Sequence, residues 1–398
     1  MDLGFGIWEW LGFGIWSLGF DVHYTPPVPL TSLRTPCVLI DQKRVERNIE
    51  RMQDAAVAAG KRLRPHAKTH KSPDLALTQI ARGAVGICCA KLGEAEVFAD
   101  HRVADIRLPY PLNPVNGDRV LALLDRIRLS FIVDHLDVAR GWSRVMQGAG
   151  RQVDVLVKID VGFHRCGVDP QTTDAVDFVA RVAELPGLTL KGLLSHAGHA
   201  YGAASEAEVS AIARREAETL TTLRDQLEGK GVAIEEISVG ATPTARFSAE
   251  LDGITELRPG NYVYYDRMQV GLGAATWDDC ALTVLARVVS RPAADRLILD
   301  AGSKTLTNDL ARGAPGHGAV QRGLDTPAPD ERLLIERLSE EHATVRVSGT
   351  GCALAPGDLV RIVPNHACTV SNLIDEAWIV NGLDTVDKLR IAARGRIT

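Results

Sequence analysis

Short apolar runs alternate with segments of helical periodicity between residues 37 and 242. In the segment 42–59, apolar side chains recur at Val45, Ile49, Met52 and Ala56, which is the spacing of one face of a helix. Repeated strand-then-helix units predict a parallel sheet, and eight of them in about 230 residues match a (β/α)8 TIM-like barrel of the α/β class. The predicted strands are 37–40, 62–69, 85–90, 105–111, 129–134, 153–162, 188–198 and 234–242, and the main predicted helices are 42–59, 72–81, 91–101, 114–125, 136–148, 171–184 and 204–230.

A doubly wound open sheet is the alternative architecture for such an alternation. It is disfavoured because no predicted strand ends in a G-x-G-x-x-G turn. From about residue 275 the pattern changes to β-branched runs separated by Gly, Pro, Asp and Asn, which indicates a second, mostly β domain. We therefore expect a leader at 1–26, a barrel at 27–270, and a C-terminal β domain at 271–398.

The leader is unusual because it repeats LGFGIW within residues 3–20. It lacks the basic start and the cleavage site of a signal peptide, and it is too short and too rich in glycine for a membrane span. A disordered leader or an upstream-start artefact is favoured, and a peripheral or interface-packing segment is the alternative.

The amino-acid composition of the chain disfavours some classes of function. The chain is 45% hydrophobic and 24% charged, with a net charge of −5, which is typical of a soluble globular protein. Without a basic tail or patch, nucleic-acid binding is not expected, and neither is membrane binding. Seven cysteines without repeating spacing do not form a disulfide framework, which favours a reducing cytoplasm.

Polar side chains gather where the predicted barrel strands end, which is where barrel enzymes carry their chemistry. The first group is RLRPHAKTHK at 62–71, which holds six cationic or potentially cationic residues. A solvated basic face is the simplest interpretation of such a run. However, Lys68 lies at a strand end among other cations, which would depress its pKa and suit it to form a Schiff base with an aldehyde.

If that aldehyde is a phosphorylated cofactor, the site also needs backbone N–H groups and hydroxyls around a phosphate. Two glycine-centred loops offer them, SVGATPTA at 238–245 and, within LRPGNYVYYD at 257–266, the turn at Gly260 and Asn261. The cationic run then matches an anionic cofactor, and we interpret it as part of an active site. The candidate phosphate-binding residues are Gly240, Ala241, Thr242, Gly260 and Asn261.

His366 and Cys368 form an H-x-C pair in the predicted β domain. On a strand, residues two apart point to the same face, so both could reach one ion, and imidazole with thiolate favours zinc or a similar divalent metal. The alternative is a structural cysteine beside a turn histidine.

The chain resembles the D-threonine aldolase and D-serine dehydratase family from about residue 31 to 398. The resemblance rests on TPCVLID, RPHAKTHK, GICCAKLGEAEVFA, VDVLVKIDVGFHRCGV, SHAGHAY, VGATPT, TELRPGNYVYYD, LDAGSK, SEEHATV and VPNHACT, in that order. It implies a pyridoxal 5′-phosphate (PLP) enzyme with an alanine-racemase-like barrel and a C-terminal β domain.

The resemblance also implies roles for single residues. Lys68 would carry the cofactor beside His66, and Arg165 would face its pyridine ring. The loops named above would hold its phosphate, and Tyr201 would orient it. His366 and Cys368 would hold a divalent ion (Mn, Zn or Mg). His196 and His199 are the candidate catalytic bases, although each alone could be structural.

The favoured activity is retro-aldol cleavage of D-3-hydroxy amino acids, with D-threonine giving glycine and acetaldehyde. A D-serine dehydratase giving pyruvate and ammonia is the alternative, favoured by Cys368, because some aldolases of the family carry H-x-D. A non-catalytic PLP-binding barrel would need no H-x-C pair, and an alanine racemase would need different motifs. The resemblance further implies action on D substrates only and a head-to-tail homodimer.

Overall fold

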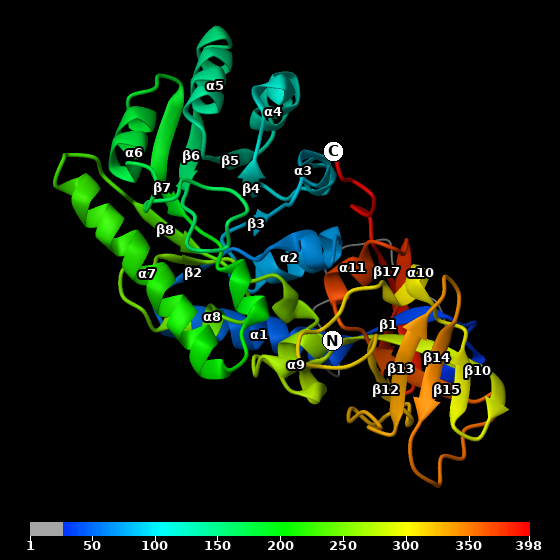
Figure 1. The fold of residues 1–398 in the computed structure, drawn as a ribbon. Helices are drawn as coiled ribbons and strands as arrows, with labels where there is room; N and C mark the ends of the chain where they lie inside the picture. Colours follow the sequence, from blue (N-terminus) through cyan, green and yellow to red (C-terminus); the bar gives the residue numbers. More distant parts are fainter. Residues whose placement is uncertain (1–26) are drawn as a thin grey trace, which may run out of the picture.

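The computed structural model describes residues 27–398, so the expected leader at 1–26 lies outside the described residues. Figure 1 shows two domains side by side, with the parallel strands and their helices in one and the antiparallel strands in the other. This arrangement confirms the predicted fold class.

The first domain is a barrel of eight parallel strands in the order β2-β9-β8-β7-β6-β5-β4-β3. Its two edge strands meet at a single parallel bridge between His66 and Cys88, where the Cys88 N–H donates to the Pro65 carbonyl at 2.8 Å. The strands are β2 (Arg62–Leu63), β3 (Ile87–Cys88), β4 (Asp105–Pro111), β5 (Arg128–Val133), β6 (Val153–Lys158), β7 (Leu188–Leu194), β8 (Glu236–Val239) and β9 (Glu256–Leu257).

Helices follow the strands around the outside of the barrel (Figure 1). Local caps set where several begin: Asp41 accepts from the Arg44 N–H at 3.0 Å, and Ser205 accepts from the Glu208 N–H at 3.2 Å. No helix within residues 27–398 is long and apolar enough to cross a bilayer. The helices of this domain are α1 (Gln42–Ala58), α2 (Pro73–Ala81), α3 (Leu92–Asp100), α4 (Gly117–Leu124), α5 (Leu136–Gly148), α6 (Ala175–Ala183), α7 (Glu206–Glu228), α8 (Ala245–Ala249) and α9 (Arg267–Gly271).

One predicted barrel strand belongs to the other domain. The run 37–40 forms β1 (Cys37–Asp41), which pairs antiparallel with β10 and parallel with β16 in the second sheet. The eighth barrel strand is β9, which is two residues long and ends where the predicted glycine-centred loop begins. A two-residue strand is too short to produce a periodic pattern, whereas β1 is buried at its centre like a barrel strand.

The second domain is mostly β, as predicted. Its strands β10, β11, β14, β13, β12 and β15 close on themselves through the β10–β11 pairing, and β1, β16 and β17 extend the sheet beyond β10. The elements are β10 (Leu282–Ala293), β11 (Arg296–Leu299), α10 (Ser303–Leu306), β12 (Ala319–Gln321), β13 (Leu333–Leu338), β14 (Ala343–Val347), β15 (Leu359–Val363), α11 (Ala367–Ser371), β16 (Glu376–Asn381) and β17 (Asp384–Arg390).

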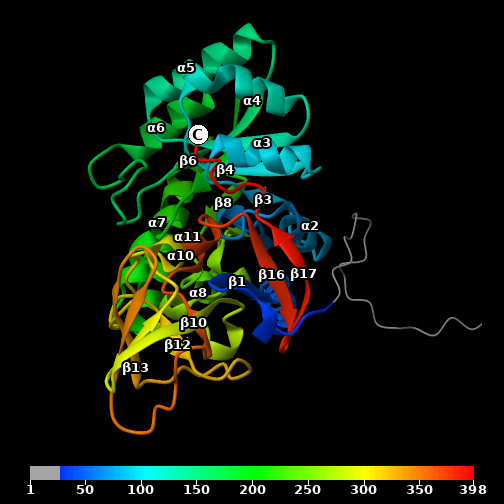
Figure 2. The same ribbon diagram turned by 90° about the vertical axis from the view of Figure 1, so that its right-hand side faces the viewer.

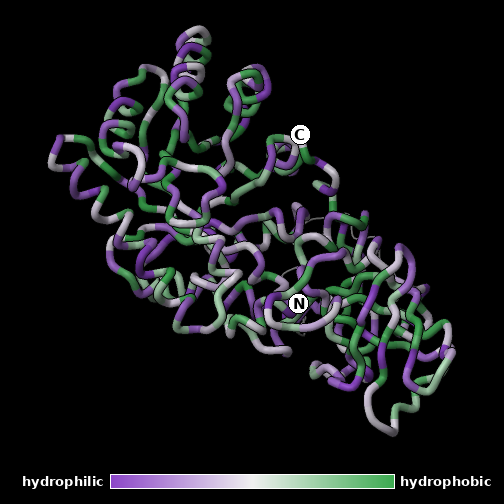
Figure 3. Tube along the Cα trace, viewed as in Figure 1, coloured by the Kyte–Doolittle hydropathy of each residue, from purple (hydrophilic) through white to green (hydrophobic). Residues whose placement is uncertain are grey.

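Each domain has its own apolar core, and apolar positions alternate with polar ones along both (Figure 3). The barrel interior also holds buried charges. Glu256 accepts from Arg107 at 2.5 Å and from Arg64 at 2.9 Å, and Arg107 also donates to Glu236 at 2.8 Å. Although burial opposes it, these two arginines lower the pKa of Glu256 to about 2, so the carboxylate stays ionised inside the barrel.

The second domain reaches the barrel where β2 ends. The Ala393 N–H donates to the Lys71 carbonyl at 3.0 Å, and α11 packs against the short 3-10 helix η3 (Ala67–Thr69). Figure 2 shows α11 lying between the barrel and the β domain. This junction brings the two predicted chemical motifs together.

Candidate functional site

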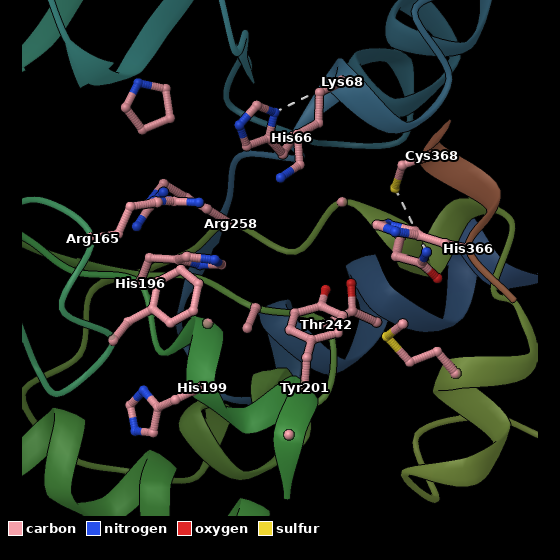
Figure 4. A pocket seen from close by; sticks show the side chains of 18 of the residues that line it. His66, Lys68, Arg165, His196, His199, Tyr201, Thr242, Arg258, His366 and Cys368 are labelled. Carbon is pink, nitrogen blue, oxygen red and sulfur yellow. Dashed lines mark hydrogen bonds between the residues drawn. The ribbon is translucent and has the colours of Figure 1, made fainter. Parts of the chain in front are cut away.

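A cavity of about 500 Å³ opens at the carboxyl ends of the barrel strands, beside α11 (Figure 4). Its volume is in the range of small-molecule sites. Every predicted site residue except Gly240 lines it. These residues are His66, Lys68, Arg165, His196, His199, Tyr201, Ala241, Thr242, Gly260, Asn261, His366 and Cys368.

Lys68 enters this cavity from η3, which follows β2 after a connection of three residues. His66 precedes the helix as its N-cap, and its Nδ1 accepts from the Lys68 N–H at 3.4 Å. Burial and the neighbouring charges of Lys68 and Arg258 hold the pKa of His66 well below its usual range, so its imidazole is neutral. The structure therefore supplies a half-buried primary amine in a cavity with a neutral ring beside it.

The rest of the cationic run does not face the cavity, which corrects the interpretation of the whole run as part of the active site. Arg64 lies in the charge network inside the barrel, and His70 is buried in the core. Lys71 is buried against Glu94, with 2.5 Å between Nζ and Oε1. Of the residues in this run, only His66 and Lys68 line the cavity.

Two loops offer unpaired donors to the cavity. The Thr242 hydroxyl is buried without a hydrogen-bond partner among the described residues, although Tyr201 lies close by. The backbone N–H groups of Ala241 and Gly260 likewise have no acceptor within residues 27–398. A Cβ at Gly260 would lie 2.8 Å from the His66 carbonyl oxygen, so only glycine fits there. Buried donors without partners are the expected property of an anion site.

Gly240 does not line the cavity itself, but it contacts a residue that does. Its carbonyl accepts a hydrogen bond from Nδ1 of His196. That contact leaves Nε2 of His196 as the free ring nitrogen, and burial with the charges of Lys158 and Lys68 holds the pKa of this histidine well below its usual range. His196 is therefore a neutral acceptor at the cavity. Burial also lowers the pKa of His199, which lies further from Lys68 (Figure 4).

The loop after β6 covers one side of the cavity. Its start is fixed by Asp160, whose Oδ1 accepts from the N–H groups of Gly162 at 2.9 Å and of Phe163 at 3.1 Å. The Phe163 ring lies edge-on to His196 with 5.7 Å between centroids, and the Arg165 guanidinium lies 5.0 Å from the Phe163 ring. Arg165 thus reaches the cavity from an exposed loop.

A second arginine, Arg258, lies deeper and was not singled out from the sequence. It is buried, its Nε donates to the Ser238 hydroxyl at 2.7 Å, and a further N–H donates to the Ser195 carbonyl. Figure 4 shows Arg165 and Arg258 on the same side of the cavity. The sequence signal was its place directly before the PGN turn, at the end of β9.

His366 and Cys368 do not lie on a strand, which corrects the prediction. His366 is the N-cap of α11, and Cys368 lies in the first turn of that helix. The Cys368 thiol lies 3.1 Å from the hydroxyl of Thr69, the residue that follows Lys68 in the chain. Although burial opposes both shifts, each partner stabilises the charge of the other, so the pKa of Cys368 is lowered and that of His366 is raised. A thiolate is the form that binds metals.

Within residues 27–398, no cluster of three or more His, Cys, Asp or Glu side chains could hold a metal ion. The pair therefore offers at most two ligands, and the cavity side remains open. Metal sites with open positions are typical of catalytic rather than structural centres.

Comparison with known proteins agrees with this geometry. The family described as alanine racemase, N-terminal domain, matches residues 40–268, and the putative serine dehydratase domain matches residues 281–380. D-threonine aldolase from Arthrobacter sp is 34% identical over 93% of this chain and 95% of its own. The chain belongs to the D-threonine aldolase and D-serine dehydratase family.

Other members of the family are similar over most of their length. D-threo-3-hydroxyaspartate dehydratase from Delftia sp. (strain HT23) is 34% identical over 85% of this chain and 92% of its own. A variant of such a dehydratase with a cysteine replaced by alanine, in the metal-free form, has a TM-score of 0.85 at 30% identity and covers 91% of this chain and 98% of its own.

Lys158 is a further cavity residue of this family member that sequence reasoning missed. It ends β6, is almost fully buried, and lines the cavity near Arg258. Burial and the charge of Arg258 lower its pKa to about 7. The unfolded chain retains the ordinary lysine pKa, so Lys158 costs stability at neutral pH, and this cost falls as the pH rises from about 7 toward 10.5.

At pH 7 we expect the free energy of unfolding of the Lys158→Met protein to be higher than that of the original protein, because the variant does not bury a charge. This increase in the free energy of unfolding should be at least about 1 kcal/mol larger at pH 7 than at pH 9.5. Urea unfolding at the two pH values, without added ligands, measures it. Lys43→Met, on the exposed side of α1, is the control. A gain that does not change with pH would contradict the assignment.

Proposed function

We propose that this enzyme is a PLP- and divalent-metal-dependent D-threonine aldolase, a lyase that cleaves D-3-hydroxy amino acids to glycine and an aldehyde. One observation carries the proposal: a single cavity of one chain contains the Lys68 amine, the unpaired donors of Ala241, Thr242 and Gly260, and the His366–Cys368 pair. Each of these three groups, taken alone, also fits other kinds of binding site. Together they match a substrate held at its amine and at its 3-hydroxyl.

The cavity fits PLP at both of its ends. Lys68 would hold the aldehyde carbon, and the unpaired Thr242 hydroxyl with the Ala241 and Gly260 N–H groups would hold the phosphate. Arg165 or the buried Arg258 would face the ring. When bound, PLP supplies an electron sink at the substrate Cα, and the ion supplies a Lewis acid at the hydroxyl.

His366 and Cys368 fit a divalent ion because, once the ion displaces the ring proton of His366, an imidazole nitrogen and a thiolate are both available as donors. This donor pair suits zinc or a similar metal, and Mn or Mg remains in the proposal from the family resemblance. Two protein ligands leave coordination positions for water and the 3-hydroxyl of the substrate. A solved relative also supports a metal, since the dehydratase variant with a cysteine replaced by alanine is a metal-free form.

The proton of that hydroxyl needs an acceptor. His196 is neutral with Nδ1 bound to the Gly240 carbonyl, so its Nε2 can take a proton without prior loss of one. His199 is the second candidate, and its Nδ1 is buried without a partner among the described residues. Tyr201, whose pKa burial raises, stays protonated and can only donate or orient.

D-serine dehydratase, giving pyruvate and ammonia, is the second candidate. It is supported by Cys368, and by the match of the C-terminal domain to the putative serine dehydratase domain. The two activities differ in which bond at the substrate Cα breaks. A non-catalytic cofactor carrier is not supported, because it would not need the His366–Cys368 pair.

Products separate the two activities. With PLP and Mn²⁺ present, we expect D-threonine to yield glycine and acetaldehyde, and D-serine to yield little pyruvate. Chromatography of glycine and a coupled assay for pyruvate measure both in one incubation. Pyruvate from D-serine as the main product would reverse the assignment.

We further propose a cytoplasmic homodimer that acts on D substrates only. The described cavity takes its lysine and its His–Cys pair from the same chain, so the partner is not needed to supply them. Phe163 and Leu310 are exposed apolar side chains, 36% and 64% accessible, which a second subunit would cover.

A further inference from the structure

A carboxylate from outside the cavity contacts the histidine of the His366–Cys368 pair. Asp309 lies in the segment between α10 and β12, far from both motifs in sequence. Its Oδ2 lies 3.3 Å from Nδ1 of His366 and accepts from the Thr369 hydroxyl at 2.7 Å. Asp309 does not line the cavity, so it touches His366 from behind.

The position of Asp309 is set by a clamp at the base of its loop. The side-chain amide of Asn365 donates to the Asp309 carbonyl at 2.8 Å and to the Gly316 carbonyl at 2.9 Å. The Thr307 hydroxyl accepts from the Asp309 N–H at 3.2 Å. One buried amide thus closes the 309–316 loop next to His366, so backbone and side-chain contacts both hold the carboxylate in place.

Asp266 is the other carboxylate near His366, and both of its oxygens already accept hydrogen bonds from other groups. Its Oδ2 accepts from the Ala367 N–H at 2.9 Å and from the Asn261 amide at 2.5 Å, while its Oδ1 accepts from the Gln269 N–H at 3.1 Å. Asp309 is therefore the carboxylate available to the ring nitrogen of His366.

We propose that Asp309 is a positioning residue for the metal site: it holds the Nδ1–H of His366 and so directs Nε2 toward the ion. This inference rests on the proposed metal-dependent function. A histidine whose other ring nitrogen donates to a carboxylate is fixed in tautomer and orientation and binds a metal more tightly. Thr369 completes the arrangement, because its hydroxyl holds the same carboxylate oxygen.

The test measures metal affinity directly. Competition with a chromophoric chelator gives the Kd of Zn²⁺ for the PLP-loaded protein, and the cobalt spectrum of the Co²⁺ form reports the thiolate ligand. We expect Asp309→Ala to weaken Zn²⁺ binding roughly 10- to 100-fold, and Asp309→Asn to weaken it less, since the amide oxygen can still accept the hydrogen bond. Thr369→Val should give a smaller loss in the same direction.

Asp330→Asn is the matched control, because that carboxylate pairs with Arg332 elsewhere in the β domain and should leave the Kd unchanged. Circular dichroism and the cofactor absorbance confirm that each variant is folded and loaded. Unchanged Zn²⁺ affinity in Asp309→Ala, with tight binding by the original protein, would overturn the positioning role alone. An original protein that binds no Zn²⁺ or Co²⁺ would overturn the metal-dependent function as well.

Discussion

The Lys68→Ala protein should lose turnover by roughly 10³-fold or more and should no longer hold PLP covalently, because it lacks the cavity amine of η3 that would bind the cofactor. The original protein should be yellow, absorbing at roughly 420 nm, and borohydride should fix the cofactor on Lys68. Absorbance before and after denaturation measures attachment, and peptide mapping after reduction locates it.

Two other lysines make this experiment decisive. Lys71 is three residues away but is bound to Glu94, and Lys158 lines the same cavity from β6. Lys158→Met is the matched control, and its reduced peptide should still carry the cofactor on Lys68. A label on Lys71 or on Lys158 in the original protein would refute the assignment.

The second large effect concerns the metal. EDTA, His366→Ala and Cys368→Ala should each lower aldol cleavage roughly 10²- to 10³-fold, since the 3-hydroxyl then loses its Lewis acid. The yellow colour should persist, because cofactor attachment depends on Lys68 and the loops at Thr242 and Gly260. Activity with added Mn²⁺ or Zn²⁺, together with the absorption spectrum, measures both properties.

Cys352→Ala provides the control, because Cys352 is a buried cysteine of the same domain that does not line the cavity. It should retain activity and metal content. Full activity in His366→Ala or Cys368→Ala would show that the pair is structural. Loss of the yellow colour along with the metal would show that the two sites are not separate.

The fold was predictable where elements are long. The predicted helix at 136–148 coincides with α5, and that at 42–59 with α1 to within one residue, because their periodic patterns span several turns. The error came from short strands. β1 has the apolar character of a barrel strand but pairs with β10, and β9 has two residues and no pattern. Which sheet a buried strand joins depends on long-range pairing, which periodicity does not contain.

For the site, the residue types at the ends of the predicted strands indicated which side chains carry the chemistry. The contacts that surround those side chains could not be predicted from the sequence. Lys68 and Thr242 were found because both lie in motifs of unusual composition. Arg258 precedes the PGN turn and Lys158 ends β6, but the position of a single cation at a strand end does not show whether it faces a cavity. The contact of Asp309 with His366 spans 57 positions of the chain and arises from loop closure by Asn365. No local sequence pattern predicts such a contact.

The most direct test of the aldolase assignment is the formation of glycine from D-threonine by the protein loaded with PLP and Mn²⁺. We predict glycine and acetaldehyde in equal amounts, no reaction with L-threonine, and loss of glycine formation on adding EDTA. 2-Oxobutanoate and ammonia in place of glycine, or turnover of L-threonine at a comparable rate, would contradict it.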